Sequence, residues 1–84
     1  MRISCDPSSR YWHRAVAFAS VHVAGEQVRR VTEACEESNR LWVCPEGGHE
    51  TIEHEPAGRV ELVFHDLLGT RLTREEAQKL YWPV

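Results

Sequence analysis

Hydrophobic and polar residues alternate over most of the first 66 positions of this 84-residue chain. The clearest alternation covers residues 59–65, where Val60, Leu62 and Phe64 face one side of an extended backbone. Shorter segments of the same kind, separated by turn-forming residues, are residues 2–5, 15–24, 27–33, 41–44 and 50–55. The pattern predicts a chain built mainly of short β-strands.

The apolar segment 15–24 changes phase in its middle. Val16 and Phe18 face one side of an extended chain, whereas the later valines face the other side. Because side chains alternate strictly along a strand, this shift predicts a bulge or bend near Ala19 and Ser20.

Residues 27–38 carry two patterns. Val28, Val31 and Cys35 have helical spacing, and the polar residues around them include good helix formers. The segment also follows a tight turn, so it could pair back onto the preceding strand as a hairpin. We favour a strand for residues 27–33, and the helical alternative stays open at this point.

The last segment, residues 73–82, predicts a helix. Thr73 and Glu76 have the spacing of a capping box, in which each side chain bonds to the backbone N–H of the other, and Pro83 ends the helix. One apolar stripe of this helix consists of Ala77, Leu80, Tyr81 and Val84. A helix this short needs tertiary packing, so we expect it to lie on the sheet.

These elements predict a single domain over residues 1–84, mainly β in residues 1–66. The expected fold is α+β: a small, bent antiparallel β-sheet of four to six strands in meander order, with the C-terminal α-helix on or beside it. A chain of this length has a thin core. The expected core members are Ile3, Val16, Phe18, Val21, Val23, Val31, Leu41, Val43, Val60, Leu62, Phe64, Leu80 and Tyr81.

Charge is distributed unevenly along the chain. Residues 33–66 contain nine acidic side chains and two arginines, whereas residues 1–32 contain five arginines and two acidic side chains. A basic end beside an acidic belt indicates recognition of a partner more than catalysis. The sequence has no nucleophile motif and no glycine-rich phosphate loop, so we expect a protein that is not an enzyme.

Two groups of residues are candidates for an interaction surface. The basic and aromatic group has side chains that suit a protein interface, or the phosphates and bases of a nucleic acid: Arg10, Tyr11, Trp12, Arg14, Arg29 and Arg30. The acidic group is Glu50, Glu53, Glu55 and Glu61. A pI near 5.9 disfavours nucleic acid as the general partner, which leaves nucleic-acid binding as an alternative.

The acidic group is open to three interpretations. It is a solvated surface, or it complements the arginine-rich end of another copy in a homo-oligomer, or it mimics a phosphate backbone and occupies a basic groove. A charge run alone does not choose between them.

A possible zinc site comes from Cys35, Cys44, His49 and His54, whose spacing is C-x8-C-x4-H-x4-H. These are the ligand types of tetrahedral zinc, but the tight C-x2-C pair of common zinc sites is missing. We therefore expect no cofactor, with the two cysteines as small buried side chains and the histidines on the surface. Zinc binding stays as an alternative.

A resemblance to a known group of proteins is carried by these segments, in this order: Arg2–Ser4 with Asp6-Pro7, Val21–Gly25, Val28-Arg29, Val31–Ala34 with Glu36-Glu37, and Gly58–Glu61. Over residues 1–64 the chain resembles small uncharacterised proteins of tailed phages and prophages. The resemblance implies a β-meander and a viral accessory protein that works by binding in a bacterial cytoplasm. Cys35, at a position where an acidic residue is expected, and the C-terminal helix depart from it.

Location and function follow as expectations. No apolar run approaches the ~20 residues needed to cross a bilayer, and the N-terminus lacks the pattern of a signal peptide. We expect a cytoplasmic, non-catalytic protein-interaction module, a phage or prophage accessory protein that binds a host or viral protein.

Overall fold

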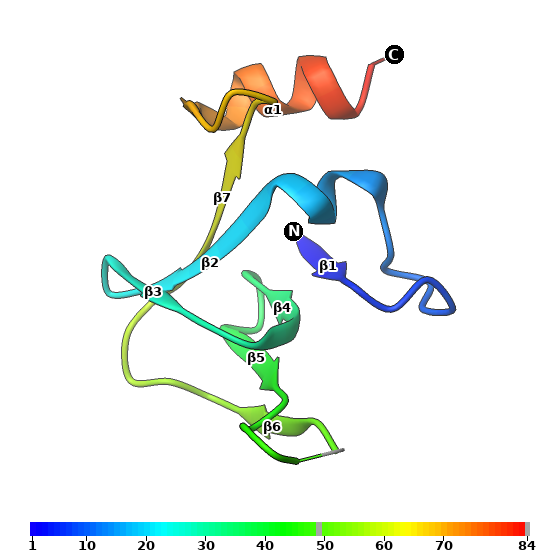
Figure 1. Cartoon of the computed structure of the whole chain (residues 1–84). Helices are drawn as coiled ribbons and strands as arrows, with labels where there is room; N and C mark the ends of the chain where they lie inside the picture. The colour runs from blue at the N-terminus through cyan, green and yellow to red at the C-terminus, as the bar shows by residue number, and fades with distance from the viewer. Residues whose placement is uncertain (49, 84) are drawn as a thin grey trace.

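The computed structural model describes residues 1–48 and 50–83, which form two four-stranded antiparallel sheets and a C-terminal helix (Figure 1). The first sheet has the order β1-β4-β5-β6, with β1 at Arg2–Ser4, β4 at Val31–Cys35, β5 at Arg40–Val43 and β6 at Ile52–His54. The second has the order β3-β2-β7-β8, with β3 at Glu26–Val28, β2 at Ala19–Val23, β7 at Val60–His65 and β8 at Arg71–Leu72.

The α+β fold class and the C-terminal helix predicted from the sequence are confirmed. The strands divide into two sheets of four, where the sequence predicted one sheet of four to six. The division occurs at Arg30, whose φ of 64° is left-handed and turns the chain sharply. As a result, the predicted strand 27–33 is extended but split, since β3 pairs with β2 while β4 pairs with β1 and β5.

The prediction of a strand from residue 15 is wrong for its first part. Residues Arg14–Phe18 form a 3₁₀-helix, η1, and β2 begins at Ala19. His13 caps η1, because its Nδ1 accepts the backbone N–H of Ala15 at 3.0 Å. The change of phase near residue 19 therefore marks the end of a helix turn and not a bulge within a strand.

One cluster of buried side chains draws on both sheets and on the helix. Of the predicted core members, the buried ones are Ile3, Leu41, Val60, Leu62, Phe64 and Tyr81. Those packed against them and partly buried are Val16, Phe18, Val21, Val23, Val31 and Val43. The buried hydrophobic residues outside the predicted core are Ala15, Ala34, Val63 and Ala77. Cys35 is buried as expected, whereas Cys44 is only partly buried. Leu80 was predicted in the core and is wrong, since it is 49 % exposed.

The helix α1 spans Arg74–Tyr81 and has the predicted capping box. The Thr73 hydroxyl accepts the backbone N–H of Glu76 at 3.1 Å, and the Glu76 carboxylate accepts that of Thr73 at 2.9 Å. Val84, predicted on the apolar stripe, lies outside the described residues. Among the described residues, no helix is long and apolar enough to cross a membrane.

Two side chains of the turn between β4 and β5 connect the first sheet to the second. The Glu36 carboxylate accepts the backbone N–H of Leu62 at 3.0 Å, and the Asn39 side-chain oxygen accepts that of Val60 at 2.7 Å. Asn39 also donates to the carbonyl of Gly58 at 3.0 Å. These side chains bond to the edge of β7 as a neighbouring strand would, and so hold the two sheets together.

Candidate functional site

The loop between β7 and β8 has a backbone that is fixed by a single aspartate. Asp66 Oδ1 accepts the N–H groups of Leu68 and Thr70, both at 2.9 Å. The backbone adds two bonds, from Gly69 N–H to the Asp66 carbonyl and from Asp66 N–H to the Thr70 carbonyl, both at 3.0 Å. Gly69 has a φ of 83°, which a residue with a side chain adopts at a cost. The loop is therefore a well-defined hairpin turn.

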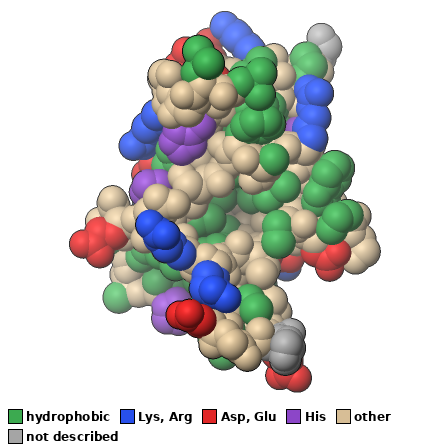
Figure 2. Space-filling view, in the orientation of Figure 1, with side chains coloured by type: hydrophobic (Ala, Val, Ile, Leu, Met, Phe, Trp, Pro, Cys, Tyr) green, Lys and Arg blue, Asp and Glu red, His purple; other side chains and the backbone are tan. Residues whose placement is uncertain are grey.

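This turn presents two leucines to solvent. Leu67 is 83 % exposed and Leu68 is 91 % exposed, at positions where hairpin turns usually carry polar residues. Leu80 lies on the outer face of α1, next to these two leucines, and all three side chains line one hollow. In Figure 2, hydrophobic side chains gather over the upper part of the molecule, where Figure 1 places α1.

A hollow of about 420 Å³ lies between this loop, η1 and α1. We call its lining the leucine surface, which consists of Arg14, Phe18, Asp66, Leu67, Leu68, Leu80 and Tyr81. Contiguous exposed apolar surface of this kind marks an interaction site more often than isolated apolar residues do.

The floor of the leucine surface is a pair of stacked rings. The Phe18 and Tyr81 rings have centroids 5.3 Å apart and an interplanar angle of 12°. The Tyr81 hydroxyl donates to the carbonyl of His65. Burial of the hydroxyl, and to a smaller extent the negative charge of Asp66, raise its pKa above the ordinary value. The ring is thus fixed by packing and by a hydrogen bond, so the floor is rigid.

The rim carries one group of each charge. An Arg14 guanidinium N–H donates to the carbonyl of Tyr81 at 3.4 Å, which holds the positive group beside the hollow. Asp66, the negative group, uses Oδ1 to fix the loop. The leucine surface thus combines an apolar floor, two protruding leucines and a rim that carries one group of each charge.

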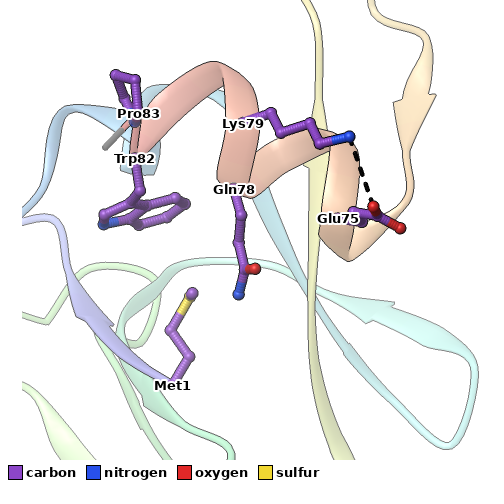
Figure 3. Close-up of a pocket in the computed structure, with 6 residues that line it drawn as sticks. All are labelled: Met1, Glu75, Gln78, Lys79, Trp82 and Pro83. Atoms are coloured by element: carbon purple, nitrogen blue, oxygen red, sulfur yellow. Dashed lines mark ion pairs between the residues drawn. The ribbon is translucent and has the colours of Figure 1, made fainter.

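A larger hollow, of about 700 Å³, lies on another side of α1. Figure 3 shows Trp82 and Gln78 pointing from the helix toward Met1. Glu75 and Lys79 also line this hollow and form an ion pair at 3.5 Å. Its lining carries more polar surface than that of the leucine surface, and none of its residues is among the large hydrophobic side chains that are strongly exposed.

The predicted basic and aromatic group is distributed over separate contacts. Tyr11 lies between two arginines, with the guanidinium carbons of Arg2 and Arg10 at 4.0 and 5.7 Å from its ring centroid. Trp12 is 44 % exposed, and Arg14 belongs to the leucine surface. These side chains therefore do not form the single cluster that their order suggested.

Arg29 and Arg30 lie in the bend between β3 and β4. Arg30 Nε donates to the carbonyl of Cys44 at 3.2 Å. Within residues 1–48 and 50–83, no ring contact or hydrogen bond joins these two arginines to the aromatic group.

Most of the predicted acidic group pairs within the molecule. Arg40 pairs with Glu53 and, at 4.0 Å, with Glu55, and Arg71 pairs with Glu61 at 3.0 Å. Glu50 is exposed. On the face of the molecule that Figure 2 draws, the acidic side chains form separate groups and not a continuous belt.

Other acidic side chains of the middle segment are paired too. The Arg2 guanidinium donates to Glu33 at 2.6 Å, because β1 pairs with β4 in antiparallel register. The Glu37 carboxylate pairs with the amino group of Met1. Most acidic side chains of the middle segment thus form internal ion pairs, and of the five N-terminal arginines only Arg2 takes part among the described residues.

The described residues of the possible zinc site, Cys35, Cys44 and His54, do not form a metal-binding group. Cys35 lies at the end of β4 opposite Arg40, whereas Cys44 follows the other end of β5, so a strand length separates them. His54 pairs with Leu41, and His49 lies outside the described residues. Among residues 1–48 and 50–83, no group of three His, Cys, Asp or Glu side chains could hold a metal ion.

Comparisons with protein-family models, curated proteins and solved structures find no match to this chain.

The sequence analysis did not select the leucine surface. A local signal was present, since Asp66-Leu67-Leu68-Gly69 has turn residues at both ends and two leucines between them. Apolar residues at the tip of a turn have no core to enter and so must face solvent. The approach of Phe18 and Leu80 to the same place depends on the tertiary fold and has no such local signal.

Proposed function

We propose that this protein is a non-catalytic protein-interaction module that binds its partner through the leucine surface. The observation that carries the proposal is the exposure of Leu67 and Leu68, 83 % and 91 %, on a loop that Asp66 fixes by hydrogen bonds. A mobile loop would lose conformational entropy on binding, which would weaken the complex. In this protein the hydrogen bonds of Asp66 already order the loop when the chain folds, so less entropy is lost on binding.

The energetics require contacts beyond the two leucines. Burial of an exposed leucine side chain contributes about 1.5–3 kcal/mol, so the two leucines together contribute about 3–6 kcal/mol. Association itself costs about 4–15 kcal/mol, so the stacked floor and Leu80 must take part as well. Their side chains line the same hollow, which allows one partner to contact all of them.

The chemistry of the lining supports binding in preference to catalysis. Its three polar side chains already hold the protein's own structure, since Asp66 fixes the loop, Arg14 bonds to a backbone carbonyl and the Tyr81 hydroxyl donates to one. A general base or nucleophile needs to reach a substrate atom with its lone pair available. The resemblance to small phage and prophage proteins agrees with a role in binding a host or viral protein.

The test is affinity capture with the purified protein immobilised, in an extract of the organism that encodes it. The double variant Leu67→Ser/Leu68→Ser removes the apolar tip and leaves the aspartate that fixes the loop. Ile52→Ser is the matched control, because Ile52 is another large hydrophobic side chain, 57 % exposed, on the edge strand β6. We expect the double variant to lose the specifically captured protein and the control to retain it.

Two further variants test the surfaces first suggested by the sequence. Trp12→Ala and Glu53→Lys/Glu55→Lys are expected to retain the captured protein. Loss of capture in either of these, with full capture by the double leucine variant, would contradict the proposal.

A further inference from the structure

We propose that the partner bound by the leucine surface is a second copy of this chain, packed face to face about a two-fold axis. This inference rests on the proposed function, since it names the occupant of that same surface. A two-fold interface uses one patch on both subunits, so the patch must complement itself. The leucine surface meets this requirement in shape and in charge.

The shape combines a projection and a hollow. Leu68, the most exposed large hydrophobic residue among those described, projects from the loop, and the hollow beside it is floored by Phe18 and Tyr81. In a two-fold arrangement each copy inserts its leucines into the hollow of the other. Each copy then buries both of its leucines, so four leucines enter the interface. One set of residues supplies both halves of the contact.

The charges at the rim are also self-complementary. Arg14 and Asp66 line the same hollow, and a two-fold axis that passes between them would bring the Arg14 of each copy toward the Asp66 of the other. Within the described residues, the hydrogen bonds to the Asp66 carboxylate are accepted by Oδ1, so Oδ2 is the atom that would accept from the second copy. Two such pairs at the rim would fix the register of the dimer, as rim charges commonly do.

The surface area of the monomer fits an additional interface. The accessible surface is 5922 Å² for a chain of 9.7 kDa. Folded monomers of that mass expose about 5100 Å², so this chain exposes about 800 Å² more than expected. A standard protein interface buries about 800 Å² on each partner.

Sedimentation equilibrium over a range of protein concentrations, from about 1 to 500 μM, tests the inference. We expect the wild-type protein to approach twice the monomer mass and to stay there, since a two-fold contact closes at two copies. Leu68→Asp should weaken the dimer at least about tenfold, which corresponds to the loss of about 1.4 kcal/mol. Ile52→Asp, the matched exposed control, should dimerise as the wild type does.

The folded state of each variant is checked by circular dichroism and by its unfolding midpoint. Leu68 is 91 % exposed, so its substitution should leave the monomer folded. A wild-type protein that stays monomeric at 500 μM, that grows beyond two copies, or that dimerises equally well as Leu68→Asp would overturn the inference.

The capture experiment separates this inference from the proposed function. A monomeric protein that still captures another protein through Leu67 and Leu68 keeps the function and loses the second copy as partner. A monomeric protein whose capture is unaffected by the double leucine variant loses both.

Discussion

The Glu36 carboxylate accepts two hydrogen bonds from the guanidinium group of Arg74, at 2.9 and 2.8 Å. Glu36 lies in the turn after β4, and Arg74 is the first residue of α1. The same carboxylate accepts the N–H of Leu62, and the same guanidinium donates to the carbonyl of Leu62. One ion pair thus joins the first sheet, the second sheet and the helix that carries Leu80.

Replacement of Glu36 tests this arrangement. Glu36→Gln removes the charge and one of the paired acceptors, so the partly buried Arg74 loses its counter-ion. We expect the free energy of unfolding to fall by about 2 kcal/mol, as measured by urea denaturation. The matched control is Glu75→Gln, which breaks the exposed pair with Lys79 and should cost less than about 0.5 kcal/mol. Equal effects of the two variants would show that the pair does not hold the elements together.

Stability in acid depends on the same carboxylate. Burial raises the pKa of Glu36, but the bonds from Arg74 and from the Leu62 N–H lower it by more, so it lies below the ordinary 4.5. The unfolded chain therefore takes up a proton before the folded one. The contribution of Glu36 is present above pH 4.5 and is lost as the pH falls through the folded pKa.

Urea denaturation between pH 3 and 7 measures this loss. Relative to the wild type, Glu36→Gln should have a weaker dependence of unfolding free energy on pH below 4.5. If the unfolding free energies of the wild type and of Glu36→Gln change with pH in parallel, the folded state does not stabilise the ionised form of Glu36.

His13 predicts a second, separate dependence on pH. Its Nδ1 accepts the N–H of Ala15, and its ring stacks on Trp82 with centroids 4.2 Å apart. Burial, and to a lesser extent Arg14, lower the pKa of His13 below the ordinary 6.5, and protonation of Nδ1 would break the cap. Since the unfolded chain binds the proton more tightly, stability should decline as the pH falls below 6.5 and level off below the folded pKa.

An NMR titration of the His13 ring protons checks this directly. We expect the pKa of His13 to lie below the ordinary 6.5, because burial of the ring disfavours its protonated form. In His13→Asn, which keeps a capping side chain, the fall in stability between pH 6.5 and 5 should be smaller than in the wild type. A His13 ring that titrates at or above its ordinary value would contradict the role given to the cap.

Asn39 combines an unusual backbone with specific bonds. Its φ of 56° is left-handed, and its side chain bonds to the backbone at Gly58 and Val60. Asn39→Ala should lower the free energy of unfolding by about 2 kcal/mol, through backbone strain and the lost bonds. Asn39→Gly removes the bonds without the strain and should cost about 1 kcal/mol less than the alanine variant. Thermal or urea unfolding of both gives the difference, and equal losses would exclude strain at this position.

Local patterns predicted the elements that are stabilised locally. The alternation over residues 59–65 became β7, and the spacing of Thr73 and Glu76 became the capping box of α1. Both depend on residues within a few positions of each other. The end of η1 at Phe18 was detected as a change of phase but was assigned to the wrong structure, because alternation does not distinguish a short helical turn from a bulge.

The division into two sheets and the leucine surface depend on contacts between distant residues. No pattern in residues 27–33 reveals that Arg30 adopts a left-handed backbone. The apolar stripe of the helix included both Leu80 and Tyr81, but only Tyr81 faces the core. Leu80 faces outward and lines the surface that we propose as the binding site. Because the sequence analysis placed Leu80 in the core, it missed this part of the surface.

The most direct test of the account is an NMR experiment on methyl groups at increasing protein concentration. Signals of Leu67, Leu68 and Leu80 should shift together as the second copy binds, and those of Ile52, which is exposed on β6, should not move. In Leu68→Asp, the signals of the two remaining leucines, Leu67 and Leu80, should stay fixed as the concentration rises. Constant leucine signals with shifts at Ile52 or near Trp12 would contradict the assignment of the binding surface.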